Sequence, residues 1–121
     1  MENKKTLVLG ASQNPARYSY LALKRLSAKN YPVVAIGKNP GKVDNIEIET
    51  AKKPINDLDT ITLYLNPNNQ KQYYDYILRL HPKRIIFNPG AENYELETLA
   101  STNGIKTMEA CTLVLLSTGQ Y

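Results

Sequence analysis

Four Asn-Pro pairs, each following an apolar segment, are the first residues in this sequence that point to a binding function. The pairs are Asn14-Pro15, Asn39-Pro40, Asn66-Pro67 and Asn88-Pro89. Proline ends a strand because it has no backbone N–H, and asparagine can cap a helix or offer its amide to a ligand. Turn formation alone explains any one pair. Because ligands of open α/β sheets bind outside the carboxyl ends of the strands, the four pairs together indicate a binding site at one sheet edge.

The turn from Gly10 to Arg17 has the composition of a phosphate-binding turn. It joins an apolar run to a helical pattern, so backbone N–H groups and the helix dipole can hold an anion there. Ser12 adds a hydroxyl donor and Arg17 a charged one. The turn departs from the full G-x-G-x-x-G fingerprint, because Ser12 occupies the position of the second glycine of the fingerprint and Pro15 has no N–H. Ser19 is small enough to let the helix approach the strand, which is the role of the third glycine.

The end of the second apolar run is basic rather than acidic. It reads Gly37-Lys38-Asn39-Pro40-Gly41-Lys42, whereas an NAD site usually has Asp or Glu here to hold the ribose hydroxyls. Taken alone, Lys38 or Lys42 is more simply explained as a solvated loop lysine. In combination with the first turn, the basic side chains favour a nucleotide with an additional ribose phosphate, which means NADP or coenzyme A.

Few side chains are suited to acid–base or nucleophilic chemistry. The single histidine, His81, precedes Pro82 at an expected helix end, where a capping role is favoured. The single cysteine, Cys111, can form no internal disulfide and is expected to be a buried structural residue. Glu92 is expected to begin a helix. We therefore expect no metal site, assign no catalytic residue and favour binding over catalysis.

The elements that position these turns alternate between strands and helices. Strands are expected at 6–10, 33–37, 60–65, 84–87 and 105–110, and helices at 18–29, 67–80, 93–103 and within 111–121. Residues 38–59 have two prolines and no helical period, so a loop with a short hairpin around 43–49 is expected. In the 93–103 helix, Leu96, Leu99 and Ala100 are expected to face inward. The alternation predicts a doubly wound α/β fold with a mainly parallel five-stranded sheet, helices on both sides, and one domain over 1–121.

Composition limits the remaining classes of function. Of the 121 residues, 42% are hydrophobic and 21% are charged, which excludes a disordered or fibrous chain. The net charge is +4, but the basic residues are scattered, so no nucleic-acid surface is expected. No segment approaches the ~18 apolar residues that span a bilayer, and the apolar stretch 6–10 is too short for a signal peptide. We expect a cytoplasmic protein without a membrane partner, as a monomer or homodimer.

In their order along the chain, the turns resemble those of the small bacterial CoA-binding domain proteins. The segments that carry the resemblance are Gly10-Ala11-Ser12-Gln13-Asn14-Pro15, Asn39-Pro40-Gly41-Lys42, Asn66-Pro67 and Asn88-Pro89-Gly90-Ala91-Glu92-Asn93. The resemblance extends from Leu7 to the region of Cys111. That family is similar in fold to the nucleotide-binding domain of the succinyl-CoA synthetase alpha subunit, so a Rossmann-like fold with a CoA site is implied.

The resemblance also implies roles for particular residues. Ser12, Gln13 and Asn14 would line the first turn, while Asn66 and Pro67 match a segment that lies along the cofactor. Lys42 matches the lysine of the synthetase's Pro-Gly-Lys turn and would meet a CoA phosphate. With Arg17 and Lys38 added for their charge and position, the candidate binding residues are Gly10, Ser12, Gln13, Asn14, Arg17, Lys38, Asn39, Pro40, Lys42, Asn66, Pro67, Asn88, Pro89 and Gly90.

The leading hypothesis is a CoA or acyl-CoA binding module without catalytic activity of its own. It would hold the CoA pyrophosphate at the first turn and the nucleotide end at the strand carboxyl-end rim. A counterpart of the domain that bears the synthetase's phosphorylated histidine is not expected in this one-domain chain. The alternative is an NADP-dependent oxidoreductase or an NADP-binding regulatory domain, which would share the basic end of the second strand.

Overall fold

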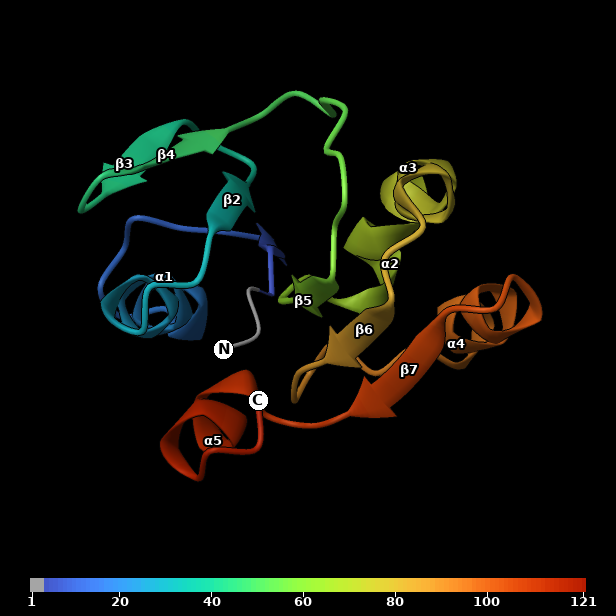
Figure 1. Ribbon diagram of the computed structural model, residues 1–121. Coiled ribbons are helices and arrows are strands. Elements are labelled where there is room, and N and C mark those ends of the chain that lie inside the picture. The colour runs from blue at the N-terminus through green and yellow to red at the C-terminus, as the bar shows by residue number, and fades with distance from the viewer. Residues whose placement is uncertain (1–3) are drawn as a thin grey trace.

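The centre of the computed structural model is a seven-stranded sheet in the order β3-β4-β2-β1-β5-β6-β7 (Figure 1). The structure describes residues 4–121. The strands are β1 (Thr6–Leu9), β2 (Val33–Ile36), β3 (Gly41–Val43), β4 (Ile46–Glu49), β5 (Thr60–Leu63), β6 (Arg84–Phe87) and β7 (Lys106–Glu109). The helices are α1 (Tyr18–Ala28), α2 (Pro67–Gln70), the 3₁₀ turn η1 (Lys71–Tyr73), α3 (Tyr74–Leu80), α4 (Tyr94–Thr102) and α5 (Thr112–Ser117).

The predicted doubly wound α/β fold is confirmed. Every pair of neighbouring strands is parallel except β3 with β4. Helices α1 and α5 cover one face of the sheet, and α2, α3 and α4 cover the other (Figure 1). From β1 the chain proceeds to β2 on one side and later to β5 on the other. The strand order therefore reverses between β1 and β5, which is where ligands bind in such sheets.

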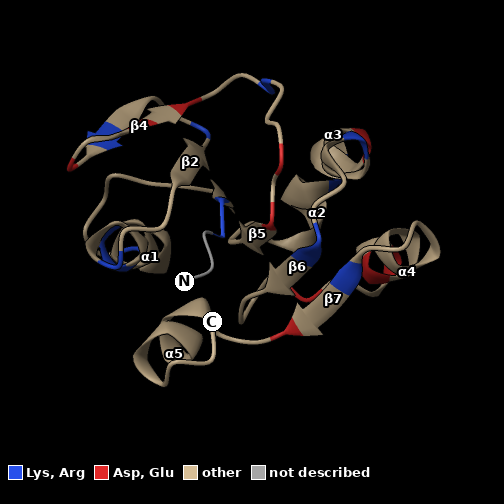
Figure 2. Ribbon diagram, in the orientation of Figure 1, with Lys and Arg blue, Asp and Glu red and all other residues tan. Residues whose placement is uncertain are grey.

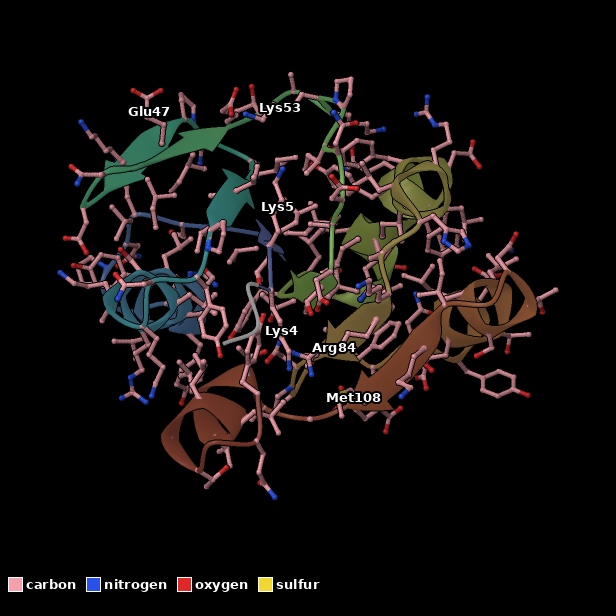
Figure 3. All side chains as sticks on the ribbon, viewed as in Figure 1. Lys4, Lys5, Glu47, Lys53, Arg84 and Met108 are labelled. Atoms are coloured by element: carbon pink, nitrogen blue, oxygen red, sulfur yellow. The ribbon has the colours of Figure 1, made fainter. Side chains whose placement is uncertain are left out.

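The sheet has seven strands rather than the expected five because the hairpin joins it. The hairpin expected around 43–49 forms from β3 and β4, with Asp44 at φ +53° between them. Strand β4 also pairs in parallel with β2, and β3 becomes the outer strand. The alternation in Ile46-Glu47-Ile48-Glu49 explains the docking. Ile48 is 3% exposed and packs with Val43 in the core, while Glu47 is exposed (Figure 3).

The central strands are apolar on both sides because both faces of the sheet are covered. Leu7 and Leu9 of β1 belong to the cluster under α3 and α4, and Val8 between them belongs to the cluster under α1 and α5. All three side chains are fully buried. Residues 6–9, 60–63 and 84–87 therefore form the centre of the sheet, and the turns that follow them lie at its carboxyl edge.

Two helical expectations need correction. The expected 67–80 helix is divided into α2, η1 and α3. Leu99, which was expected to face inward, is 36% exposed, whereas Leu96 and Ala100 are fully buried. Helix α4 packs beside β7, the outermost strand on that side, so the sheet lies beneath only a narrow stripe of the helix. None of the helices among residues 4–121 is long and apolar enough to cross a membrane.

The segment after α5 is anchored at the amino edge of the sheet, opposite the turns. Tyr121 is 6% exposed. The centroid of its ring is 4.4 Å from the Arg84 guanidinium and 5.1 Å from the centroid of the Tyr31 ring. Its hydroxyl shares a 2.5 Å hydrogen bond with Thr6 Oγ1, and Lys4 Nζ donates to its backbone oxygen at 2.7 Å. Lys4 and Arg84, both labelled in Figure 3, lie near the Tyr121 ring, with Lys4 Nζ 5.7 Å from its centroid. These contacts hold the C-terminal segment away from the carboxyl edge.

Tyr121→Phe tests how much this anchor contributes to stability. The variant keeps the ring and its contact with Arg84 but removes the hydroxyl that pairs with the buried Thr6. We expect the free energy of unfolding to fall by about 1 kcal/mol, the usual net worth of a hydrogen bond. Urea denaturation measures this value. The control is Tyr94→Phe, at a position that is 84% exposed, and its free energy of unfolding should equal that of the wild-type protein. An equal loss of stability in both variants would contradict the anchoring role of Tyr121.

Candidate functional site

A surface cleft of about 980 Å³ opens at the carboxyl ends of the strands, across the point where the strand order reverses. One wall is the turn after β1 with the start of α1, comprising residues 10–14 and 16–19. Residues 38–40, which follow β2, form the second side, and residues 64–66 and 69, which follow β5, form the third. Pro89, after β6, completes the lining. Each of the four Asn-Pro turns thus contributes at least one residue to this cleft.

Most of the residues selected from the sequence line the cleft, but four do not. Those that do are Gly10, Ser12, Gln13, Asn14, Arg17, Lys38, Asn39, Pro40, Asn66 and Pro89. Lys42, Pro67, Asn88 and Gly90 lie outside the lining. Pro67 instead begins α2, where Asn66 caps the helix by accepting the Asn69 N–H at 2.9 Å. The Gly90 N–H donates to Glu92 Oε1 at 2.8 Å.

Local side-chain bonds shape the first turn. Ser12 Oγ accepts the Asn14 N–H at 3.0 Å, and Asn14 Oδ1 accepts the Ala16 N–H at 3.0 Å. The N–H groups of Gly10 and Ala11 both donate to Ile36 O, which fixes the turn to the end of β2. Within residues 4–121, the N–H groups of Ser12 and Gln13 have no acceptor. This leaves two backbone donors in the wall of the cleft.

Helix α1 begins at this wall without a cap. Its N-cap residue, Arg17, makes no capping bond with its side chain, and its first turn contains no acidic residue. The first N–H groups of a helix have no partner within the helix and carry a partial positive charge. Because Tyr18 and Ser19 line the cleft, that charge faces the ligand space. Ser19, in the first turn of the helix, is buried together with Ala22, Leu23 and Leu26.

All the charged side chains that line the cleft are cationic. They are Arg17 and Lys38, both exposed, and no Asp or Glu is among the described residues of the lining. Elsewhere, Lys and Arg as well as Asp and Glu occur on many of the other elements (Figure 2). The local arrangement, with two cations, an open helix N-terminus and free backbone N–H groups, suits an anionic ligand.

The side of the cleft after β5 is uncharged. Tyr64 lines it, and the hydroxyl of this tyrosine is buried without a hydrogen-bond partner among the described residues. Burial raises the pKa of Tyr64 to about 12, so the phenol is neutral in the physiological pH range. Leu65 and Pro89 add further apolar surface. Tyr64 and Leu65 were expected inside the third strand. They line the cleft because β5 ends at Leu63, two residues earlier than expected.

Asn88 has a structural position rather than an open one. It is 2% exposed. Its amide donates to Thr62 Oγ1 at 2.8 Å and to Leu63 O at 2.9 Å, and its Oδ1 accepts the Thr112 N–H at 2.8 Å. These bonds join β6 to β5 and to the start of α5. In the sequence this pair looks like the other three Asn-Pro pairs, so no local signal distinguishes it.

Contacts between the first turn and the hairpin were not expected from the sequence. Gln13 Oε1 accepts the Lys42 N–H at 3.2 Å. At Gly37, which is buried, a Cβ would lie 2.2 Å from Ala11 O, so only glycine lets the first turn approach the end of β2. The shape of the cleft therefore depends on contacts between segments that are far apart in the sequence.

His81 and Cys111 lie outside the cleft. His81 ends α3 with φ +47°, and its Nε2 is 2.9 Å from Asn103 O. Cys111, which was expected to be buried, is only half-buried, because it is the N-cap residue of α5. Among residues 4–121, no group of three or more His, Cys, Asp or Glu side chains is arranged to hold a metal ion.

Solved structures resemble the whole chain. A crystal structure of an uncharacterized protein is 47% identical, covers 100% of both chains and has a TM-score of 0.97. A hypothetical protein from Pyrococcus horikoshii is 19% identical over 93% of this chain and 80% of its own, with a TM-score of 0.83. A Thermus thermophilus protein is 19% identical over 98% and 91%, with a TM-score of 0.85. The latter two establish similarity of fold alone.

A family model completes the comparison. No curated protein matches the chain. The family model described as CoA binding domain matches residues 4–117, which include all the strands and helices described above. The match contains all three walls of the cleft, from the first turn to Pro89. The chain therefore belongs to the CoA-binding domain family.

Proposed function

We propose that the protein is a binding module for CoA or acyl-CoA, and that the ligand occupies the cleft at the carboxyl edge of the sheet. The observation that carries the proposal is that all the charged side chains lining the cleft are cations beside an uncapped helix N-terminus. CoA carries a pyrophosphate and a 3′-phosphate, so it matches a site of this charge. Membership in the CoA-binding domain family supports the same ligand class.

The pyrophosphate is assigned to the first turn. The N–H groups of Ser12 and Gln13, which have no acceptor among the described residues, would bind the anion together with the amino end of α1, and Arg17 would add a charged donor. Hydrogen bonds to a charged group contribute about 1.5–3 kcal/mol each. A few such bonds account for the phosphate part of a micromolar affinity, which corresponds to about 8 kcal/mol in total.

The nucleotide end is assigned to the loop after β2 and the pantetheine arm to the uncharged side after β5. Lys38 lines the cleft and is the cation nearest in sequence to the end of β2, so it is the candidate partner of the 3′-phosphate. Tyr64 and Leu65 offer apolar surface to the pantetheine arm. No His, Cys, Asp or Glu is among the described lining residues, which is why we propose binding without catalysis.

Calorimetric titration with CoA and with CoA lacking the 3′-phosphate, at one fixed salt concentration, tests the proposal. We expect CoA to bind more tightly by about 1.5–3 kcal/mol, the worth of a hydrogen bond to a charged group. Lys38→Met should remove most of this difference, and Lys42→Met should leave most of it, because only Lys38 lines the cleft. Absence of heat with either compound would contradict the proposed ligand. If Lys42→Met proved the more damaging variant, the 3′-phosphate would have been assigned to the wrong lysine.

A further inference from the structure

A long-range hydrogen bond joins the first turn to the β3–β4 hairpin. Gln13 Oε1 accepts the Lys42 N–H at 3.2 Å across 29 residues of sequence. Because β3 is the outermost strand, a backbone N–H that points away from β4 has no strand to pair with. Gln13 supplies the missing acceptor for Lys42. The root of the hairpin is thereby fixed to the wall of the cleft.

Gly41 provides the space that this contact needs. A Cβ at position 41 would lie 2.7 Å from both Cδ and Oε1 of Gln13. Any larger residue would therefore push the Gln13 amide away from the Lys42 N–H. The glutamine and the glycine fit each other, although neither is close to the other in sequence.

The loop of residues 38–40 is held at its two ends, one of which is the Gln13–Lys42 hydrogen bond. At its first end the Gly37 N–H donates to Glu49 O at 2.9 Å, and at its second end Lys42 is held by Gln13. Within the described part of the chain, residues 38–40 make no hydrogen bond of their own, and all three are exposed. The position of Lys38 is thus determined by what holds the two ends of the loop.

We propose that Gln13 is a positioning residue, which holds the loop of residues 38–40 so that Lys38 meets the 3′-phosphate of CoA. This inference rests on the proposed function. It assigns the Gln13 side chain a role in selectivity for the 3′-phosphate that acts through the loop, without a contact between that side chain and the ligand. Three features support this role: the Gln13–Lys42 bond, the fit of Gly41 against Gln13, and the lack of hydrogen bonds from the described residues 38–40.

The matched control is a second contact of the hairpin, which is made by helix α1 and not by the first turn. Lys24 Nζ is 3.3 Å from Asp44 Oδ1 at the hairpin tip, and both side chains are nearly half exposed. Exposed ion pairs contribute little to stability, and neither residue lines the cleft. Asp44→Asn therefore loosens the same hairpin at a place that does not determine the position of Lys38.

The test compares the affinities for CoA and for CoA lacking the 3′-phosphate, measured by calorimetry on the full chain. The wild-type protein is expected to prefer CoA by about tenfold or more, and Gln13→Met, which keeps length but has no amide acceptor, by about threefold or less. Gly41→Ala should reproduce this loss with Gln13 present, and Asp44→Asn should keep the wild-type ratio. In a Lys38→Met background, Gln13→Met should change the CoA affinity less than about twofold, because the two residues act as a unit. Hydrogen exchange should show the Lys42 amide less protected in Gln13→Met.

The outcomes distinguish failure of the proposed function from failure of the positioning role of Gln13 alone. If the wild-type protein binds neither compound, the proposed function and this inference both fail. If the wild-type protein prefers CoA and Gln13→Met keeps that preference, the positioning role alone is wrong. If Gln13→Met weakens both compounds equally, in the Lys38→Met background as well, Gln13 is a direct ligand contact and the positioning role is again wrong. If the Lys42 amide were equally protected in the wild-type protein and in Gln13→Met, the Gln13–Lys42 hydrogen bond would not exist in solution and the proposal would be wrong.

Discussion

Replacing Arg17 with methionine is expected to weaken CoA binding by about 10- to 100-fold, because one or more charge-assisted bonds to phosphate are lost. Arg17 is exposed, lies at the amino end of α1 and lines the cleft. Its side chain makes no capping bond, so the free energy of unfolding should change by less than about 0.5 kcal/mol. Calorimetric titration measures the affinity, and thermal unfolding checks that the fold is intact.

Arg25→Met is the matched control for this experiment. Arg25 is an exposed residue near the other end of the same helix. Arg25→Met lowers the net charge by one, as Arg17→Met does, so both variants change the long-range attraction of an anionic ligand by a similar amount. If Arg25→Met weakened CoA binding as much as Arg17→Met, the effect would come from net charge, and the assignment of Arg17 to the pyrophosphate would be wrong.

Gly37→Ala is expected to destabilise the protein by about 3 kcal/mol, at the upper end for overpacking a buried site. The added Cβ would lie 2.2 Å from Ala11 O and 3.2 Å from Ile48 Cγ2. Ala11 cannot move aside easily, because its N–H and that of Gly10 are bound to Ile36 O. The melting temperature should fall by about 10 °C, since 1 kcal/mol corresponds to roughly 3–5 °C for a domain of this size. CoA binding should weaken as well, because the first turn must shift.

Gly104→Ala separates the clash from the general cost of replacing glycine. Gly104 has φ +79°, and a Cβ there would have no heavy atom within 4 Å. Its replacement should cost about 1 kcal/mol from backbone strain alone. It should also leave CoA binding unchanged, because Gly104 is remote from the cleft lining. Equal costs at both positions, measured by thermal unfolding, would contradict the close packing of the first turn on β2.

The sequence predicts the layered architecture well because both faces of the central strands are buried. Runs such as Thr6–Leu9 and Arg84–Phe87 are apolar over their whole length or nearly so, and turns of clear composition separate them. The hairpin at 43–49 is also visible as an alternating pattern. Its docking beside β2 is not visible, because sheet pairing depends on the facing strand rather than on the local pattern.

The cleft is partly predictable for the same reason. The rule that ligands bind at strand carboxyl ends brings together Ser12, Lys38 and Asn66 before any coordinates are known. The rule does not tell a ligand-facing asparagine from a buried one, and Asn88 is held under α5 by bonds to residues 24–26 positions away. Gln13 with Lys42 and Gly37 with Ala11 are contacts across long sequence separations, which no local pattern encodes.

The most direct test of the binding account is to locate CoA by amide chemical shifts in a ¹H–¹⁵N spectrum titrated with the ligand. The account predicts that the largest shifts occur in residues 10–19 and 38–39, with smaller ones at 64–66, and that the amides around Arg84 and Tyr121 at the opposite edge stay unchanged. Ser12 and Gln13, whose N–H groups have no acceptor within residues 4–121, should move furthest downfield, as expected for new bonds to phosphate. Shifts concentrated at the opposite edge, or no shifts at saturating CoA, would contradict the account.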